Sequence, residues 1–346
     1  MIAPPKSESH VADPQPKLPE LEDVVRPPDS LLPLPTRSRT RSAPDKIFKN
    51  LMLAGALSLL AVVALIFFEL IYHSRLAIAK FGFGFFVGSD WDPVASQFGA
   101  LPFIYGTLVS SLVALILAVP LGIGVAVFIN EMCPRPLRGP LSFTVELLAA
   151  IPSVIYGLWA IFVLAPLLRV YGEPFLARHF GWTGLFTGPP YGIGMLAAGV
   201  ILAIMVVPFI SSITREVMLT VPQHQREGVL ALGATQWEMI RTGILRNART
   251  GIVGGIILGL GRAIGETMAV TMVIGNRPEI AKSLFAPGYT MASVIANEFT
   301  EATGNLYLSA LIEIGLALFI LTLIVNGLAR LLVWMTTRGM PSRVYG

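Results

Sequence analysis

The sequence predicts an all-α integral membrane protein with about six transmembrane helices, and three observations indicate this fold class. Of the 346 residues, 54% are hydrophobic and 13% are charged, which is about half the charged fraction of soluble domains. The mean hydropathy is +0.71. The apolar residues also gather in blocks that are long enough to cross about 30 Å of hydrocarbon at about 1.5 Å per helical residue.

We expect one transmembrane helix for each apolar block. The blocks are Leu51–Ile71, Leu101–Ile129, Leu141–Leu168, Tyr191–Ile213, Ile252–Ile274 and Leu306–Met335. The second, third and sixth are longer than a span requires, so we expect them to tilt or to protrude from the bilayer. With their connecting loops they form a predicted transmembrane domain over residues 46–346.

Residues 1–45 differ from the rest of the chain. They hold ten prolines, scattered charges of both signs and few aromatic residues. Such a segment cannot bury enough apolar surface to offset the entropy lost on ordering, so we expect a disordered tail. No apolar core lies near Met1, which argues against a signal peptide, so the first block is expected to remain as a membrane anchor.

The orientation follows from the lysines and arginines that flank the blocks. They are more numerous in the N-terminal tail, the second loop, the fourth loop and the C-terminal end than in the other loops. Because cytoplasmic segments carry the excess of positive charge, both termini are predicted to lie in the cytoplasm. The loops near 73–100, 169–190 and 275–305 are then expected to face outward.

The fourth loop, Thr214–Arg249, contains signals for two short helices. Thr220–Gln223 and Thr235–Glu238 each have the pattern of a capping box, and Gly233 can adopt the left-handed conformation that ends a helix. One apolar stripe is expected to cross the pair of helices, formed by Val229, Leu232, Trp237, Ile240 and Ile244. The loop is therefore either a connector lying on the membrane surface or a docking element for a cytoplasmic partner.

Arg262 and Glu266 lie in the middle of the predicted fifth span, where a charge costs at least about 2.5–3.5 kcal/mol. Their spacing of four places them on one helix face. One interpretation is a mutual ion pair that locks helix packing. The other is a path for an oxyanion, because a guanidinium offers a permanent charge and bidentate hydrogen bonds to an anion that loses its water. Glu266 would then hold Arg262 when the path is empty, or accept a hydrogen bond from a protonated oxyanion.

The same block is rich in glycine, with Gly251, Gly255 and Gly259 at a spacing of four, followed by Gly261 and Gly265. Small residues at this spacing let helix backbones approach closely. We therefore expect these glycines to serve helix packing, which is compatible with a path beside them.

The segment Glu227–Ala234 resembles the EAA loop of ABC-importer permeases. In that family the loop forms a coupling helix that sits in a cleft of the ATPase subunit. The resemblance implies that the coupling region of this chain includes Glu227, Leu232, Gly233, Ala234 and Trp237. The chain has no Gly-Lys dipeptide and hence no P-loop, so a separate chain must hydrolyse ATP and this chain is not itself an enzyme.

Four further segments carry a more specific resemblance. Gly259–Val270 is similar to the phosphate-specific transport permeases of bacteria, and Asp90–Pro93, Phe98–Thr107 and Glu146–Gly157 resemble their PstC-type subunit in particular. The resemblance covers about residues 46–340. It implies the type I (MetI-like) ABC importer permease fold in the inner membrane, with Arg262 and Glu266 associated with phosphate translocation.

The resemblance also implies the partners. They are a PstA-type second permease that completes a heterodimer, a dimer of PstB-type ATPases that bind ATP and Mg²⁺, and an external PstS-type phosphate-binding protein. The chain itself is expected to bind no cofactor. Its basic residues flank apolar blocks instead of forming one solvated patch, so membrane lipid is an expected contact and nucleic acid is not.

Other function classes share some of these features. A permease for sulfate, molybdate or phosphonate would share the fourth loop, and an ion-gradient-driven secondary anion carrier would share the spans and the intramembrane arginine. An intramembrane enzyme is not expected, because no aspartate follows Asp92. A metal site is not expected either, since Cys133 is the only cysteine and the four histidines lie outside the predicted spans.

Overall fold

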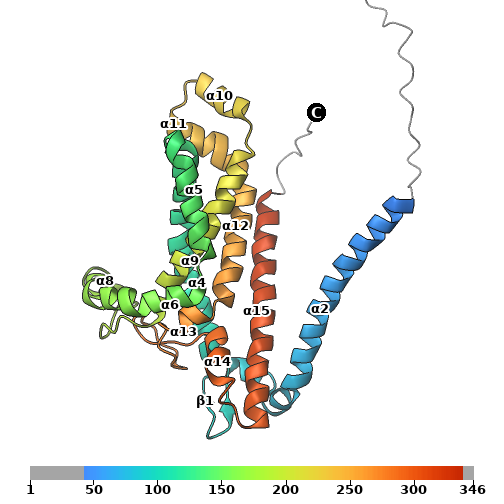
Figure 1. Cartoon of the computed structure of the whole chain (residues 1–346). Coiled ribbons are helices and arrows are strands. Elements are labelled where there is room, and N and C mark those ends of the chain that lie inside the picture. The colour runs from blue at the N-terminus through green and yellow to red at the C-terminus, as the bar shows by residue number, and fades with distance from the viewer. Residues whose placement is uncertain (1–42, 338–346) are drawn as a thin grey trace, which may run out of the picture. The chain divides into compact units, whose positions relative to one another are not determined.

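The computed structural model describes residues 43–337, and most of them are helical (Figure 1). The chain divides into two compact units, residues 1–61 and 62–346. The described part of the first unit is the beginning of helix α2 (Ala43–Phe81), in which the side chains from Asp45 to Ala61 are exposed. The predicted tail, apart from its last three residues, lies outside the described residues; those three are helical, because α2 already begins at Ala43.

Within residues 43–337, five helical segments are long and apolar enough to cross a membrane. They are Asp45–Phe81, Leu101–Met132, Ser153–Thr183, Met195–Leu219 and Asn305–Met335. This confirms a membrane-spanning helical fold, and the helices extend beyond several of the predicted blocks. The predicted outward loop 169–190, for example, is helical as far as Thr183.

The predicted third span, Leu141–Leu168, is not one helix. Helix α5 (Arg135–Ala150) ends there, Ile151 and Pro152 are extended, and helix α6 begins at Ser153 and continues toward Thr183. Proline disfavours the helical conformation of the residue before it and has no N–H for the helical ladder. The apolar block therefore combines the end of one helix with the start of the next.

The segment Ser153–Thr183 has several helical elements in succession. They are α6 (Ser153–Trp159), η2 (Ala160–Leu164), α7 (Ala165–Leu167), η3 (Leu168–Gly172), α8 (Glu173–Phe180) and η4 (Gly181–Thr183). Glu173 is buried here, and both of its carboxylate oxygens accept a hydrogen bond from the Gly192 N–H, at 3.1 and 3.0 Å. This contact ties the segment to the loop that precedes the next helix.

The predicted fifth span, Ile252–Ile274, is also broken. Helix α12 (Arg246–Gly265) ends at Gly265, Glu266 has extended backbone (φ −71°, ψ 129°), and a short helix α13 (Met268–Thr271) follows. Glycine costs about 1 kcal/mol relative to alanine in a helix interior, which favours an end at this position. Consequently α12 is not among the five candidate spans.

The core of the 62–337 part is formed by helices α4 (Leu101–Val127), α9 (Met195–Leu219), α12 and α15 (Asn305–Thr337) (Figure 1). Small and branched side chains of α4 and α9 pack together with α12 in one buried cluster. Three α12 glycines face α9 closely: an added Cβ would lie 2.5 Å from Val217 at Gly251, 3.0 Å from Ile213 at Gly255 and 2.9 Å from Val206 at Gly259. The packing role expected for these three glycines is confirmed.

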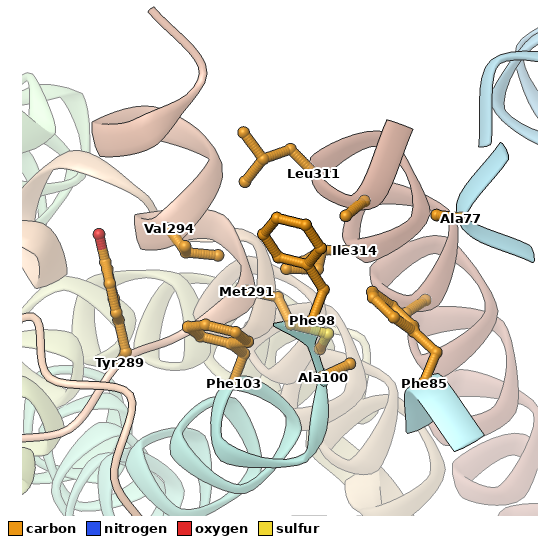
Figure 2. Packing of buried hydrophobic residues seen from close by; sticks show 12 residues of the cluster. Ala77, Phe85, Phe98, Ala100, Phe103, Tyr289, Met291, Val294, Leu311 and Ile314 are labelled. Carbon is orange, nitrogen blue, oxygen red and sulfur yellow. The ribbon is translucent and has the colours of Figure 1, made fainter. Parts of the chain in front are cut away.

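A second buried cluster, in which several aromatic side chains pack with aliphatic ones, joins the hairpin region to the neighbouring helices (Figure 2). A short helix α3 (Gly84–Val87) and an antiparallel hairpin of β1 (Trp91–Asp92) and β2 (Gln97–Phe98) pack there against α15 and α14 (Met291–Glu298). The Trp91 indole and the Tyr307 hydroxyl both donate to Glu298 Oε2, at 2.8 and 2.6 Å. The hairpin is thereby fixed to both helices.

Two glycines of α4 provide a matched test of this packing. At Gly106 an added Cβ would lie 2.1 Å from the Tyr289 carbonyl oxygen, whereas at Gly124 nothing lies within 4 Å. Gly106→Ala is expected to lower the free energy of unfolding by about 1–3 kcal/mol, because the obstructing atom belongs to the backbone. Gly124→Ala should be neutral or slightly stabilising. Thermal unfolding of the two purified variants tests this, and equal stabilities would contradict the close approach.

Candidate functional site

Arg262 lies in the last turn of α12 and its guanidinium is only partly satisfied. The guanidinium carbon is 4.3 Å from the centroid of the Phe209 ring on α9, which is a cation–π contact. Its Nε is buried and has no hydrogen-bond partner within residues 43–337. The ion pairs described for this part of the chain do not include Arg262. The side chain as a whole is half-buried, and a buried polar atom without a partner makes Arg262 a candidate functional residue.

Glu266 lies just beyond the end of α12 and does not pair with Arg262. Its backbone is extended, and its Oε1 accepts a long hydrogen bond of 3.5 Å from Ala269 N in the first turn of α13. The mutual ion pair that the spacing of four allowed is therefore wrong, because the helix ends between the two residues. They remain close in sequence on either side of a helix break.

The residues around Arg262 come from distant parts of the chain, and none of them was among the predicted site residues. Phe209 comes from α9, and Tyr156 of α6 lies within electrostatic range of Arg262. Asn326 of α15 lies against Gly261, and its Oδ1 is buried without a partner among the described residues. Buried polar atoms without partners are rare in folded proteins. The surroundings of Arg262 thus come from α6, α9 and α15, which no local sequence pattern connects.

The fourth loop contains two short helices, as predicted. Helix α10 (Gln223–Ala231) is followed by Gly233 in the left-handed conformation (φ +87°), and α11 (Gln236–Glu238) continues through η5 (Met239–Leu245) into α12. The second capping box is confirmed. Thr235 N donates to Glu238 Oε2 at 2.8 Å, and Glu238 N donates to Thr235 Oγ1 at 3.3 Å. The Glu238 carboxylate accepts hydrogen bonds from Thr235 N and also from Thr235 Oγ1, at 2.9 Å, and these two bonds hold the pKa of the Glu238 carboxyl below its usual value.

The first expected capping box is wrong. Helix α10 has Pro222 at its N-cap position, without a side-chain cap. Thr220 instead belongs to the end of α9, where its Oγ1 donates to the Val217 carbonyl oxygen at 2.7 Å. Threonine in a helical backbone conformation readily makes this hydrogen bond to the preceding turn.

The expected apolar stripe is split between two environments. Ile240 and Ile244 are buried, and Val229 packs in the same cluster. Leu232 and Trp237, however, are 90% and 63% exposed on either side of Gly233. Both side chains lie outside the five candidate spans, so their exposure is compatible with a membrane-surface connector as well as with a docking element.

The other two predicted coupling residues lie in the same region. Glu227 is exposed on α10 and accepts a hydrogen bond from Gln223 Nε2 at 2.8 Å, and Ala234 is half-buried beside Gly233. The structure therefore places Glu227 and Leu232 on α10 and its end, and Trp237 on the following helix. These residues are separate from Arg262 and Glu266 in sequence.

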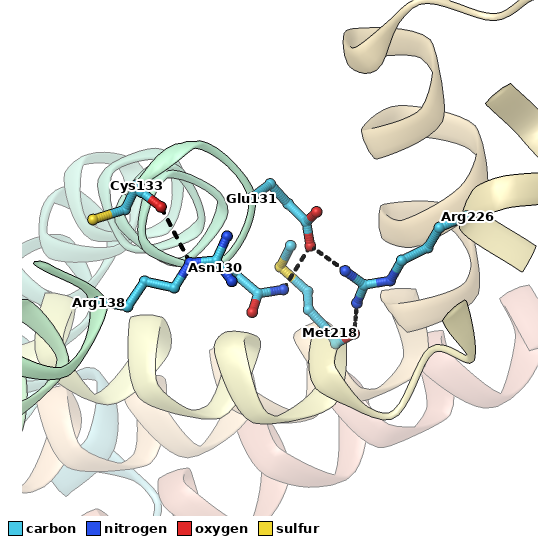
Figure 3. Close-up of polar contacts among 6 residues, drawn as sticks. All are labelled: Asn130, Glu131, Cys133, Arg138, Met218 and Arg226. Atoms are coloured by element: carbon cyan, nitrogen blue, oxygen red, sulfur yellow. Dashed lines mark hydrogen bonds and ion pairs between the residues drawn. The ribbon is translucent and has the colours of Figure 1, made fainter. Parts of the chain in front are cut away.

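A polar network that the sequence interpretation missed joins α10 to the membrane helices (Figure 3). Arg226 Nη1 donates to Glu131 Oε1 at 2.7 Å, and Arg226 Nη2 donates to the Met218 carbonyl oxygen at 2.8 Å. Asn130 Nδ2 donates to the same Glu131 oxygen at 2.6 Å. Glu131 lies in η1 (Phe128–Met132), which extends α4, and is 95 residues from Arg226.

The chain is similar in sequence to known membrane transport proteins. Residues 118–333 match the family described as binding-protein-dependent transport system inner membrane component. The chain is 50% identical to the phosphate transport system permease protein PstC of Mesorhizobium japonicum over 290 residues, which cover 83% of this chain and 89% of that protein. It is 47% identical to the protein of the same name from Xylella fastidiosa over 298 residues, covering 85% and 92%.

Among solved structures, the chain resembles a crystal structure of a bacterial ABC transporter involved in the import of the acidic polysaccharide alginate. The TM-score is 0.52 at 17% identity, covering 82% of this chain and 97% of that chain. At this identity the likeness concerns the fold alone.

Proposed function

The chain belongs to the family of binding-protein-dependent transport system inner membrane components, and we propose that it is the PstC-type permease subunit of an ATP-driven phosphate importer. It is a multi-pass protein of the inner membrane and a transport subunit instead of an enzyme. In this proposal both termini lie in the cytoplasm, on the side of the positively charged loops and of the fourth loop, because cytoplasmic segments carry the excess of lysine and arginine.

The single observation that carries the substrate assignment is Arg262. Its guanidinium is stacked on Phe209, and its buried Nε lacks a protein partner within the described residues. Stacking fixes the plane of the guanidinium without using its N–H donors, which stay available to an oxyanion. A phosphate that leaves water at this depth regains charge-assisted hydrogen bonds there.

Glu266 acts beside Arg262 as an acceptor. A carboxylate repels a fully ionised oxyanion but accepts a hydrogen bond from one that still carries a proton. Phosphate is protonated near neutral pH, whereas sulfate is not. The pair Arg262 and Glu266 therefore favours phosphate over sulfate, although only Arg262 supplies attraction by charge.

The fourth loop docks a PstB-type ATPase dimer that holds ATP and Mg²⁺. The exposed Leu232 and Trp237 enter an apolar groove of the ATPase, as amphipathic helices do in other complexes. Gly233 sets the angle between α10 and α11, so that both helices present their exposed side chains to the same partner. ATP binding moves this loop and thereby switches the path between outward-open and inward-open states.

A PstA-type second permease completes the path, and an external PstS-type protein delivers phosphate to the outward loops. The exposed face of α12 supports the heterodimer. Leu258 is 64% exposed, and nothing lies within 4 Å of a Cβ added at Gly254 or Gly265. A second helix can approach closely at these positions and enclose Arg262.

The proposed function is tested by uptake into liposomes that contain the complete complex. We expect phosphate to accumulate only when ATP is enclosed with the ATPase and binding protein is present outside, with sulfate failing to compete. Uptake that persists without ATP in the presence of an ion gradient would identify a secondary carrier instead. Competition by sulfate, molybdate or phosphonate at concentrations equal to phosphate would identify a permease for another oxyanion.

A further inference from the structure

We propose that Arg226, Glu131 and the Met218 carbonyl form the joint that transmits movement of α10 to the membrane helices. We call these three groups the Arg226 clamp (Figure 3). The inference rests on the proposed docking of an ATPase at the fourth loop. It adds a mechanical role for two charged residues that lie outside both the substrate path and the docking surface.

Helix α10 has few attachments to the rest of the protein, and the Arg226 clamp is the charged one. None of the residues of α10 is buried. Val229 packs on Gly243 of η5, where an added Cβ would lie 3.4 Å from its Cγ2, and Gln225 accepts a hydrogen bond from Asn247 at 3.1 Å. These two contacts join α10 to η5 and α12, whereas the clamp joins it to α4 and α9.

The clamp has the geometry of a rigid connection. The side chains of Arg226 and Glu131 are only 20% and 9% exposed, so water weakens their attraction little. Both terminal nitrogens of the planar guanidinium are engaged, and Asn130 donates to the same carboxylate oxygen at 2.6 Å. Each group is thereby held in one orientation, as expected of a fork-shaped donor with fixed acceptors.

A second interhelical ion pair provides a contrast. Arg215 of α9 contacts Glu146 of α5 at 3.2 Å through one nitrogen, and these side chains are 26% and 54% exposed. Exposed pairs of this kind contribute little. The greater burial and additional hydrogen bonds of the clamp therefore distinguish it from an ordinary surface ion pair.

The clamp lies at the ends of α4 and α9, and α9 also carries a residue that contacts Arg262 of the proposed substrate path. Glu131 lies in η1, the widened turn that ends α4, and Met218 lies in the last turn of α9. Helix α9 carries Phe209, which stacks on Arg262, and it packs closely against the α12 glycines. A displacement of α10 therefore shifts α4 and α9 through the clamp, and α12 through η5, so all three helices around the path move together.

The test measures phosphate transported per ATP hydrolysed by the reconstituted complex with Arg226→Gln, with Glu131→Gln and with both changes. We expect each variant to retain the ATPase in wild-type amounts and to hydrolyse ATP, while the ratio falls about tenfold, as expected for a lost coupling interaction. The double variant buries no unpaired charge, so it should assemble even where a single variant does not. Arg241→Gln, which removes an exposed arginine from the same loop, should keep the wild-type ratio.

Three outcomes would overturn the proposal that the Arg226 clamp transmits movement of α10. A wild-type ratio in the double variant would show that any single-variant defect comes only from an unpaired buried charge. Loss of the ATPase from the double variant would show that the clamp shapes the docking surface. An equal fall in phosphate transported per ATP hydrolysed in Arg241→Gln would show that removing any positive charge from the loop lowers the ratio. Failure of the proposed function is distinct from these, because the wild-type complex itself would then show no ATP-dependent phosphate uptake.

Discussion

Replacing Arg262 by glutamine is expected to lower phosphate uptake by about a hundredfold while the complex still assembles. Glutamine can donate hydrogen bonds but carries no charge, so a dehydrated anion loses its main source of attraction, worth about 3 kcal/mol. Because Arg262 makes no described ion pair, its removal leaves no carboxylate unpaired. Assembly should therefore survive the change, which separates a transport defect from a folding defect.

The measurement is ATP-dependent uptake of labelled phosphate into liposomes, alongside the amount of ATPase that co-purifies. Arg330→Gln is the matched control, since it removes an exposed arginine from the candidate span that lies within α15. Arg262→Lys should be intermediate, because lysine keeps the charge but lacks the planar fork. Normal uptake by Arg262→Gln would eliminate Arg262 from the substrate path.

The second large effect is expected at Gly233, where valine should reduce ATPase co-purification by at least about tenfold. Gly233 has φ +87°, a conformation that costs other residues about 1–2 kcal/mol and β-branched residues more. Nothing lies within 4 Å of a Cβ added there, so the effect comes from the backbone and not from a clash. Valine would change the angle between α10 and α11 and separate Leu232 from Trp237.

Asparagine at position 233 is the control, because it tolerates the left-handed conformation better than other non-glycine residues. Gly233→Asn should keep most of the ATPase binding, whereas Gly233→Val should not. Pull-down of the ATPase with each purified permease variant measures the difference. If both variants bind equally well, the loop geometry does not determine docking.

Local signals in the sequence predicted much of the fourth loop. The capping box of Thr235 and Glu238 depends on residues three positions apart, and Gly233 is one of the few residue types that readily adopts a positive φ. Both features are confirmed because neighbouring residues determine them. Thr220 had a similar pattern, but Pro222 moved the helix start and left Thr220 at the end of α9.

Hydropathy predicted four of the five candidate spans closely, but it did not predict where the helices break. Pro152 lies inside an apolar block, and its effect on Ile151 separates α5 from α6 without any change in polarity. The end of α12 at Gly265 is similar, because apolar residues continue on both sides of Glu266. This break excludes the ion pair with Arg262 that the helical spacing had suggested.

Contacts between segments that are far apart in the sequence could not be predicted from local sequence patterns. Glu131 and Arg226 are 95 residues apart, and no periodicity relates them. Phe209 lies under Arg262 only because the α12 glycines let α9 approach, although each residue alone looks like an ordinary part of an apolar helix. These pairings depend on the packing of whole helices.

The break after Gly265 has an electrostatic consequence for Arg262. The last carbonyl groups of a helix point along its axis without helical partners, and together they act like about half a negative charge. Arg262 lies in this last turn, where the negative end of the α12 macrodipole favours a positively charged residue. The backbone thus supplies a partial counter-charge that Glu266, beyond the break, does not provide by direct contact. Because that counter-charge is fractional, we expect a phosphate that reaches Arg262 to attract the guanidinium more strongly than the helix end does.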